Sequence, residues 1–499
     1  MKLKTKLQHI DAGKPIVVLN EEDAKELGVN TSDRIKISID ENTTTAIVNT
    51  TKLSVGEGEI GVFDEVEHEL SIKDGDILTL EITKRPKSID FIRKMMHGVK
   101  LNDFEIRAIV SDIVDDKLSD IETTAFVVSS YINPYDINEI VSLANAMVDT
   151  GEKIDFGSNV IDKHCIGGVA GNRTTMLLVP ILAAAGFTVP KTSSRAITSA
   201  SGTADTMEVL SCVSFNSDEI KTIVKKTGGC IVWSGSINLA PADDKIIRVR
   251  YPLSLDPKSQ LLASIMSKKK SIGADYLIVD IPVGKGAKIK ESSEGRDLAY
   301  DFINVGKRMD IVVKCLITDG NSPIGRGIGP ALEAIDVLLA LENKGKGPSD
   351  LINKSLDMAA AGLELAGKPA GREIAEEILI SGQADEKMRE IIEAQGGNPD
   401  VKVSDICLGS KTYVVKSDRK GSVRRIDNKG INLIARAAGA PKDKGAGVYL
   451  HVDVGKTIKI NDPLFTIYSE HDIKLEHAIE LANKLKSIRI GGVILEEVG

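Results

Sequence analysis

This sequence lacks paired cysteines and long apolar runs. Its five cysteines are scattered, with no Cys-x-x-Cys pair and no nearby histidines at metal spacing, so a zinc site is not expected. Free cysteines of this kind fit a reducing compartment, and we expect buried thiols. No apolar run approaches the roughly 20 residues of a membrane helix, and the first residues resemble no secretory signal. These absences predict a cytoplasmic protein with no membrane contact.

An excess of one charge is also missing. The chain carries 64 Lys and Arg against 72 Asp and Glu, a formal net charge of -8 over 499 residues, and the two signs are interspersed. No electrostatic footprint for nucleic acid is present, so any anion must be held locally. With 42% hydrophobic residues, a chain of this length can bury the cores of three or four domains.

The hydrophobic period changes along the first third of the chain. Residues 1–84 alternate β-branched runs at 15–19, 34–39, 44–49 and 77–82 with turn signals, which predicts a β-rich N-terminal domain. Residues 85–155 have helical spacing, with Asn102 as a plausible N-cap, and indicate a helical lobe of about four helices. A further helical part is expected from about residues 235–255.

The rest of the chain indicates an α/β lobe followed by a smaller domain. Within 156–420, expected strands at 159–161, 231–233, 276–279 and 311–315 alternate with helices at 174–185, 259–270 and 296–308. That alternation predicts a mixed or parallel sheet, with ligands beyond the carboxyl ends of its strands. Residues 421–499 return to short strands with one helix near 475–485, an α+β domain. The fold class is α/β multidomain.

A glycine-rich turn between a strand and a long apolar helix is the first candidate site. It runs from Asp162 to Thr175 and contains Gly167, Gly168 and Gly171. Glycines let the backbone approach a ligand, and the N–H groups of the next helix attract anions, so the turn can cradle phosphate. A tight structural connection is the alternative, with Lys163 as a solvated strand end.

A hydroxyl-rich stretch follows. Seven hydroxyl residues and Arg195 lie within the thirteen residues 191–203, a density suited to phosphate and sugar oxygens. The alternative is a polar surface loop. For Asp205 and Glu208 we favour a capping box over a ligand role.

The motifs DKHxxGGVxG from Asp162, SxRxIxxxxGTxDxxE from Ser193, APAD from Ala240 and ASIMSKK from Ala263 occur in this order. Together they resemble the thymidine and pyrimidine nucleoside phosphorylase family, over roughly residues 85–499. The resemblance implies a helical lobe and an α/β lobe that bind phosphate in the cleft between them and close on substrate. It implies no metal. The C-terminal part is similar to the family's barrel-sandwich domain.

The sequence departs from the nucleoside-specific members at several points. Cys165 replaces their serine, Ser199-Ala-Ser201-Gly-Thr203 replaces their His-Thr-Gly-Gly-Thr, and Val249 aligns near the arginine that holds a pyrimidine carbonyl. The extra N-terminal β domain and the run 194–199 look instead like the archaeal AMP phosphorylase branch. That branch converts AMP and phosphate into adenine and ribose 1,5-bisphosphate.

The resemblance to this branch implies a set of site residues. The residues that match its nucleotide contacts are Gly168, Ser194, Arg195, Ala196, Ile197, Thr198, Ser199, Thr203, Ser264 and Lys288, and Asp256 matches its general acid. For the attacking phosphate we expect Lys163, Cys165, Ser193, Thr175 and Lys268. Ser264 and Lys268 are four apart and share a helix face. Lys288 follows an apolar strand and could neutralise a 5′-phosphate, but by itself it is an ordinary surface lysine.

Asp256 allows two interpretations. It precedes a proline suited to the first helical position, so the local sequence favours an N-cap. Only the resemblance makes it the acid that protonates the departing base, while phosphate attacks C1′ from the opposite face without a covalent enzyme intermediate.

Three alternatives stay open. A pyrimidine nucleoside phosphorylase is disfavoured by Val249. A phosphoribosyltransferase of the anthranilate type would need acidic magnesium ligands for pyrophosphate. A non-catalytic nucleotide-binding assembly protein would bind without releasing base. For the favoured function we expect no cofactor, phosphate as co-substrate, and self-association as a dimer or larger homo-oligomer.

Overall fold

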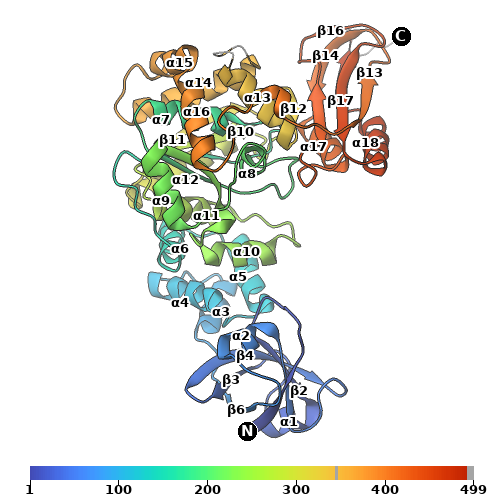
Figure 1. The fold of residues 1–499 in the computed structure, drawn as a ribbon. Coiled ribbons are helices and arrows are strands. Elements are labelled where there is room, and N and C mark those ends of the chain that lie inside the picture. Colours follow the sequence, from blue (N-terminus) through green and yellow to red (C-terminus); the bar gives the residue numbers. More distant parts are fainter. Residues whose placement is uncertain (343–344, 346, 492–499) are drawn as a thin grey trace, which may run out of the picture. The chain divides into compact units, whose positions relative to one another are not determined.

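The computed structural model describes residues 1–342, 345 and 347–491 (Figure 1). The chain forms two compact units, which are described separately. The first comprises Met1–Gly151 and Ala240–Ser267, and the second comprises Glu152–Leu239 and Lys268–Gly499. The second contains most of the residues predicted for the site.

The N-terminal β-rich domain is a closed barrel with the strand order β1-β5-β2-β4-β3-β6. Its elements are β1 (Lys2–Leu7), β2 (Ile16–Asn20), α1 (Glu21–Leu27), β3 (Arg34–Ile39), β4 (Asn42–Thr51), β5 (Glu59–Val62), α2 (Asp64–Leu70) and β6 (Ile77–Ile82). Strands β3 and β6 have the bounds that the sequence predicted. Alternate side chains such as Ile35 and Ile37 are buried, because every second residue of a strand faces the same side.

Four helices follow the barrel in the same unit, as predicted. They are α3 (Ser88–Met96), α4 (Asp103–Val114), α5 (Asp120–Ile132) and α6 (Ile137–Asp149). Asn102 caps α4 by accepting the N–H of Glu105 at 3.0 Å, which confirms the predicted N-cap. The unit also contains α10 (Pro241–Arg250) and α11 (Lys258–Ser271) up to Ser267.

The α/β lobe in the second unit is built on parallel strands. β7 (Ile161–Cys165), β10 (Tyr276–Val283) and β11 (Val312–Asp319) form one sheet in the order β11-β10-β7, and β8 (Val189–Ser193) pairs in parallel with β9 (Gly229–Trp233). A parallel bridge between Val160 and Thr188 links the two groups. Its helices are α7 (Thr174–Ala184), α8 (Thr203–Met207), α9 (Ser217–Thr227), α12 (Ser292–Arg308), α13 (Pro330–Glu342), α14 (Ser349–Leu365), α15 (Gly371–Ser381) and α16 (Gln383–Ala394). The parallel sheet confirms the predicted α/β class.

The described part of the C-terminal α+β domain contains two sheets and two helices. The sheets have the orders β12-β15-β17-β13 and β16-β14-β18. The strands are β12 (Gly327–Ile328), β13 (Lys411–Lys416), β14 (Gly421–Ile426), β15 (Gly447–Leu450), β16 (Thr457–Ile458), β17 (Pro463–Ser469) and β18 (Ile488–Gly491), and the helices are α17 (Asn428–Ala437) and α18 (Asp472–Leu485). The first sheet thus includes β12 and β13, which precede residue 421. The sequence did not predict α17.

The cysteines are free, but the expectation that they are buried is wrong for two of them. Cys212 and Cys407 are exposed, Cys230 is buried, and Cys165 and Cys315 are half-buried. Among the described residues, no helix combines the length and the apolar composition needed to cross a bilayer.

Candidate active site

The glycine-rich turn connects β7 to α7, as predicted. Gly168 has a φ of +95°, and a Cβ at this position would lie 2.5 Å from the backbone nitrogen of Lys288. Only glycine permits this close approach. The structure therefore brings together two residues, Gly168 and Lys288, that the resemblance assigned to one nucleotide.

Lys163 is the buried cation of this turn. Its side chain leaves β7, and its Nζ donates to Thr174 Oγ1 at 3.0 Å and to Thr175 Oγ1 at 3.3 Å. Lys163 is 2% exposed, and among the described residues it forms no ion pair with a carboxylate. Burial lowers its pKa, partly offset by Cys165 and Asp280. The arrangement leaves a desolvated ammonium group beside the N-terminus of α7, where an anion is favoured.

A buried carboxylate, Asp162, lies on β7 directly before Lys163. Asp162 is fully buried and pairs with Lys269 at 2.6 Å and Lys191 at 3.6 Å. Burial alone would raise the pKa of Asp162, but the two lysines outweigh it and hold the pKa below its usual value. Burial in turn lowers the pKa of Lys191 to about 7, and Asp162 only partly opposes this shift. The sequence did not predict the ion pairs of Asp162 with Lys191 and Lys269.

A second buried carboxylate, Asp280, lies on β10. It accepts hydrogen bonds from Asn172 at 3.1 Å and Thr318 at 2.6 Å, and pairs with Lys354 at 3.0 Å. Burial, with a contribution from Asp280, raises the pKa of the Cys165 thiol to about 11. Cys165 is therefore a neutral thiol at neutral pH rather than a nucleophilic thiolate. The signal for Asp280 in the sequence is a carboxylate inside an otherwise apolar strand.

The hydroxyl-rich stretch forms a loop between β8 and α8. Asp205 Oδ2 accepts the N–H groups of Ala196 at 2.7 Å and Gly202 at 2.9 Å, which closes the loop on itself. Thr203 Oγ1 accepts a hydrogen bond from Arg173 at 3.1 Å, and Arg173 also pairs with the buried Glu333. Because Arg173 precedes α7, it joins this loop to the glycine-rich turn.

Arg195 is held in the loop by an ion pair and an aromatic ring. Its guanidinium donates to the two carboxylate oxygens of Glu208 at 2.6 and 2.5 Å, and lies 4.9 Å from the ring centre of Trp233. The bond from Arg195 lowers the pKa of Glu208 to about 2. The predicted capping box of Asp205 and Glu208 is therefore half wrong, since only Asp205 bonds to the start of α8 and Glu208 binds Arg195.

Asp256 and Ser264 lie in the first unit. α11 begins at Lys258, and the N–H of Leu261 bonds to the carbonyl of Pro257 at 2.9 Å. The helix thus begins one residue after Pro257, the predicted first helical position, and the interpretation of Asp256 as N-cap stays a prediction. Asp256 Oδ1 accepts from Arg250 at 3.1 Å, with the carboxylate side chain 42% exposed. Buried Ser264 donates to Asp243 at 2.6 Å.

The other predicted residues lie on or next to strand β8 and helix α11. Ser193 ends β8, the segment 194–199 follows it, and Lys268 lies on α11 one turn after Ser264. Their roles in binding stay predictions.

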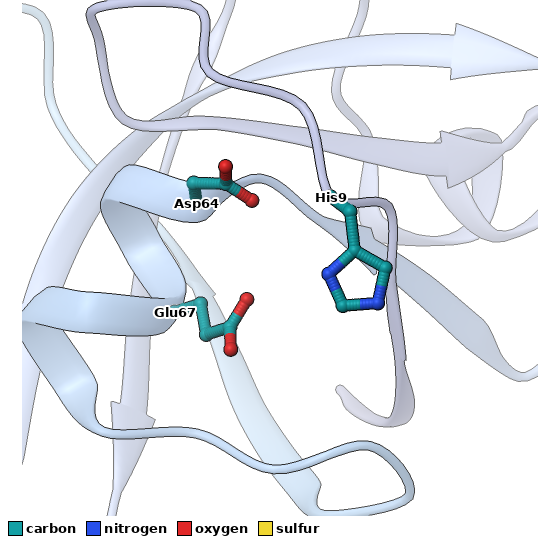
Figure 2. Close-up of side chains that lie close together, drawn as sticks. All are labelled: His9, Asp64 and Glu67. Carbon is teal, nitrogen blue, oxygen red and sulfur yellow. The ribbon is translucent and has the colours of Figure 1, made fainter.

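Among the described residues, two groups of side chains could hold a metal ion. His9, Asp64 and Glu67 lie together on the N-terminal barrel, with potential ligand atoms within 4.8 Å of one another (Figure 2). Asp443, Glu470 and His471 form the second group, where Lys474 already lies 2.6 Å from Asp443. Neither group includes a residue predicted for substrate binding, so neither enters the chemistry below.

Family models match three successive parts of the chain. The helical bundle domain of a glycosyl transferase family matches residues 89–151, the a/b domain of that family matches 157–385, and the C-terminal domain of pyrimidine nucleoside phosphorylase matches 422–489. Among solved structures, anthranilate phosphoribosyltransferase from Thermus thermophilus is similar with a TM-score of 0.54. It covers 62% of this chain and all of its own at 19% identity, which shows a shared fold only.

Full-length relatives are much more similar. AMP phosphorylase 1 from Archaeoglobus fulgidus is 50% identical over 490 residues, 98% of this chain and 97% of the relative. AMP phosphorylase from Thermococcus kodakarensis is 49% identical over all of both chains, and that from Methanosarcina mazei is 48% identical over 100% of this chain and 98% of its own. The chain belongs to the AMP phosphorylase family.

Proposed function

We propose that this chain cleaves AMP with inorganic phosphate, releasing adenine and forming ribose 1,5-bisphosphate. The observation that carries the proposal is Lys163, a buried ammonium group whose hydrogen-bond partners among the described residues are hydroxyls. Among the described residues no carboxylate pairs directly with Lys163, and Asp280 offsets its burial only in part, so the site favours a small anion that supplies further negative charge. The AMP phosphorylase relatives, similar along the whole chain, support the choice of substrate.

The bound phosphate is the nucleophile. One of its oxygens attacks C1′ of the ribose from the face opposite the base, and the C1′–N bond breaks as the new C1′–O bond forms. The Asp256 carboxyl gives its proton to the departing adenine, which would otherwise leave as an anion. The positive charge that develops on the sugar is stabilised by the phosphate itself. The configuration at C1′ is inverted, and no covalent enzyme intermediate forms.

The 5′-phosphate of AMP requires cations of its own. Lys288 lies against Gly168, and Arg195 is held in the neighbouring loop by Glu208. A cation placed for a phosphate ester penalises a substrate that lacks the ester. Lys288→Ala should therefore raise the Michaelis constant for AMP and change that for adenosine little, whereas equal losses would contradict this role.

The remaining parts of the proposal concern partners and setting. Phosphate acts as co-substrate, and the chemistry uses no metal or organic cofactor. The protein works in the cytoplasm as a dimer or larger homo-oligomer. Removal of divalent cations with a chelator should leave turnover unchanged, and the mass in solution should exceed that of one chain, 53.6 kDa.

Phosphate-dependent release of free base tests the function. The purified chain would be given AMP, CMP, UMP, GMP, thymidine and uridine, each with and without phosphate. Adenine should appear from AMP only when phosphate is present. Faster cleavage of thymidine would make the protein a nucleoside phosphorylase, and binding of AMP without release of base would make it a binding protein.

Asp256→Asn tests the acid. Asparagine keeps the size of the side chain but has no carboxyl proton to donate to the departing base. We expect turnover to be abolished while AMP binding, measured by calorimetry, is mostly kept. Turnover that survives in this variant would remove Asp256 from the mechanism.

A further inference from the structure

Helix α17 of the C-terminal domain carries three polar residues on one face. Asn428, Asn432 and Arg436 are spaced four apart, which places them in a row along the helix. The opposite face is apolar, with Ile431, Ile434 and related residues in the core of the C-terminal domain. The helix is therefore anchored in its own domain while its polar row is available to other parts of the second unit.

Asn428 bonds to the glycine-rich turn. Its Oδ1 accepts the backbone N–H of Ala170 at 3.1 Å, and its Nδ2 donates to the carbonyl of Gly320 at 2.8 Å. Asn428 is fully buried, and a Cβ at Gly286, two residues before Lys288, would lie 2.8 Å from the Asn428 side chain. One asparagine thus contacts both the turn that holds Lys163 and the loop that carries Lys288.

Asn432 and Arg436 bond to the other substrate loop. Asn432 Oδ1 accepts the N–H of Ala200 at 3.1 Å. Arg436 donates from one nitrogen to the carbonyls of Ile197 at 2.9 Å and Ser199 at 3.1 Å. These are backbone groups of the segment 194–199, which the resemblance assigned to the nucleotide. The loop is thereby fixed at its main chain, whatever its side chains bind.

The contacts are not confined to hydrogen bonds. Buried Ala170 and Ala200, one from each substrate loop, belong to the same apolar cluster as the core of the C-terminal domain. Lys444, which follows α17, lies 2.7 Å from Glu208, the carboxylate that holds Arg195. Charge, hydrogen bonds and apolar packing thus join the C-terminal domain to both loops.

We propose that the Asn428–Asn432–Arg436 face of α17 is a positioning element for catalysis: it sets the phosphate turn and the nucleotide loop in one fixed relation. The inference rests on the proposed function, since it assigns these loops to phosphate and AMP. If both loops are already ordered, substrate binding does not have to supply the free energy of ordering them. A small shift of either loop would also misalign phosphate and C1′ and slow the reaction. None of the three residues is required to touch substrate.

The proposal predicts that variants of the three residues affect the Michaelis constants for AMP and phosphate differently, which a merely structural role would not do. Asn432→Ala and Arg436→Ala release the nucleotide loop, so the Michaelis constant for AMP should rise about 5- to 10-fold, the worth of one or two hydrogen bonds. The constant for phosphate should change less than about twofold. Asn428→Ala releases the turn and should raise the constant for phosphate more than that for AMP.

Two variants serve as matched controls. Asn432→Asp keeps the oxygen that accepts the N–H of Ala200 and should restore the constant for AMP. Lys429→Ala removes an exposed cation from the same helix and should behave like the unchanged protein. Equal effects of Asn428→Ala and Asn432→Ala on both constants, or a loss of thermal stability with both constants unchanged, would overturn the proposal.

Hydrogen–deuterium exchange separates this inference from the proposed function. In Asn432→Ala the amide of Ala200 loses its acceptor, so exchange in residues 196–201 should accelerate while exchange in the core of α17 stays slow. Unchanged exchange there would refute the positioning role even if the chain cleaves AMP. Failure of the unchanged protein to release adenine would instead refute the function, and with it the catalytic role of the helix.

Discussion

The two substrate loops of the second unit hold their cations in opposite ways. In the glycine-rich turn, Lys163 is buried and donates to hydroxyls, with no carboxylate paired to it in the described part of the chain. In the nucleotide loop, Arg195 is 34% exposed, is paired with Glu208 and lies against Trp233. The first cation is desolvated and only partly offset by Asp280, with which it forms no direct ion pair, whereas the second is paired directly with Glu208.

This difference suggests separate roles for the two cations: Lys163 attracts an anion, and Arg195 orients the nucleotide. A desolvated ammonium group gains most from an incoming anion, because water no longer screens it. A paired guanidinium offers little net charge but presents a fixed planar fork of donors. The turn should therefore decide whether phosphate binds, and the loop should decide how the nucleotide lies. Variants of Lys163, Lys191, Arg195 and Cys165 test this contrast.

The largest effect is expected from Lys163→Met. The variant removes the desolvated charge from the turn, so kcat/KM for phosphate should fall about 100- to 1000-fold, the cost of losing one preorganised electrostatic contact. Because burial lowers the pKa of Lys163, its charge opposes folding, and the unfolding temperature should stay level or rise. Steady-state kinetics and calorimetry measure the two quantities.

Lys191→Met is the control for that experiment. Lys191 is equally buried, but its charge is paired with Asp162, which Lys269 continues to neutralise in the variant. The loss in kcat/KM for phosphate should be much smaller. If both variants lose activity equally, the contrast fails between a cation that pairs directly with a carboxylate and one that donates to hydroxyls.

An intermediate effect is expected from Arg195. Arg195→Ala should raise the Michaelis constant for AMP about tenfold, the worth of one hydrogen bond to a charged group, and leave that for phosphate nearly unchanged. Arg195→Lys should do little better, because lysine lacks the planar fork that binds Glu208 and stacks on Trp233. Full rescue by lysine would show that charge, not orientation, matters in this loop.

Local patterns were enough to predict much of the fold. Alternation of β-branched residues located β3 and β6, and the capping residue Asn102 located the start of α4, because both signals act within a few residues. The parallel sheet followed from the alternation of strands and helices. The helix α17 was missed because Asn428, Asn432 and Arg436 resemble a solvated face, and their partners lie more than 200 residues away in the chain.

The candidate site was only partly within reach of the sequence. The glycines and Lys163 could be found from their position between strand and helix. The pairing of Asp162 with Lys191 and Lys269 could not, because it joins residues 29 and 107 positions apart and depends on the folded sheet. The local pattern before α11 was accurate to one residue: Pro257 was predicted as the first helical position, and the helix begins at Lys258.

A smaller effect concerns stability and pH. Burial lowers the pKa of Lys191 from 10.5 to about 7, so between these values the unfolded chain binds more protons than the folded one. Stability from this group therefore rises with pH from about 7 to 10.5 and is flat outside that window. Lys191→Met should remove this rise, measured as the difference in unfolding free energy between variant and unchanged protein across the window. A difference that does not depend on pH would contradict the buried position of Lys191.

The smallest effect is expected in thiol labelling, which tests how enclosed the glycine-rich turn is. Burial raises the pKa of Cys165 to about 11, so at pH 8 about one thiol in a thousand is ionised and reactive. Cys212 and Cys407 are exposed and should react with iodoacetamide first. Mass spectrometry of the folded protein should find these two modified while Cys165 remains free. Labelling of Cys165 as fast as Cys407 would mean that water reaches the end of β7, and that Lys163 is less desolvated than its contrast with Arg195 requires.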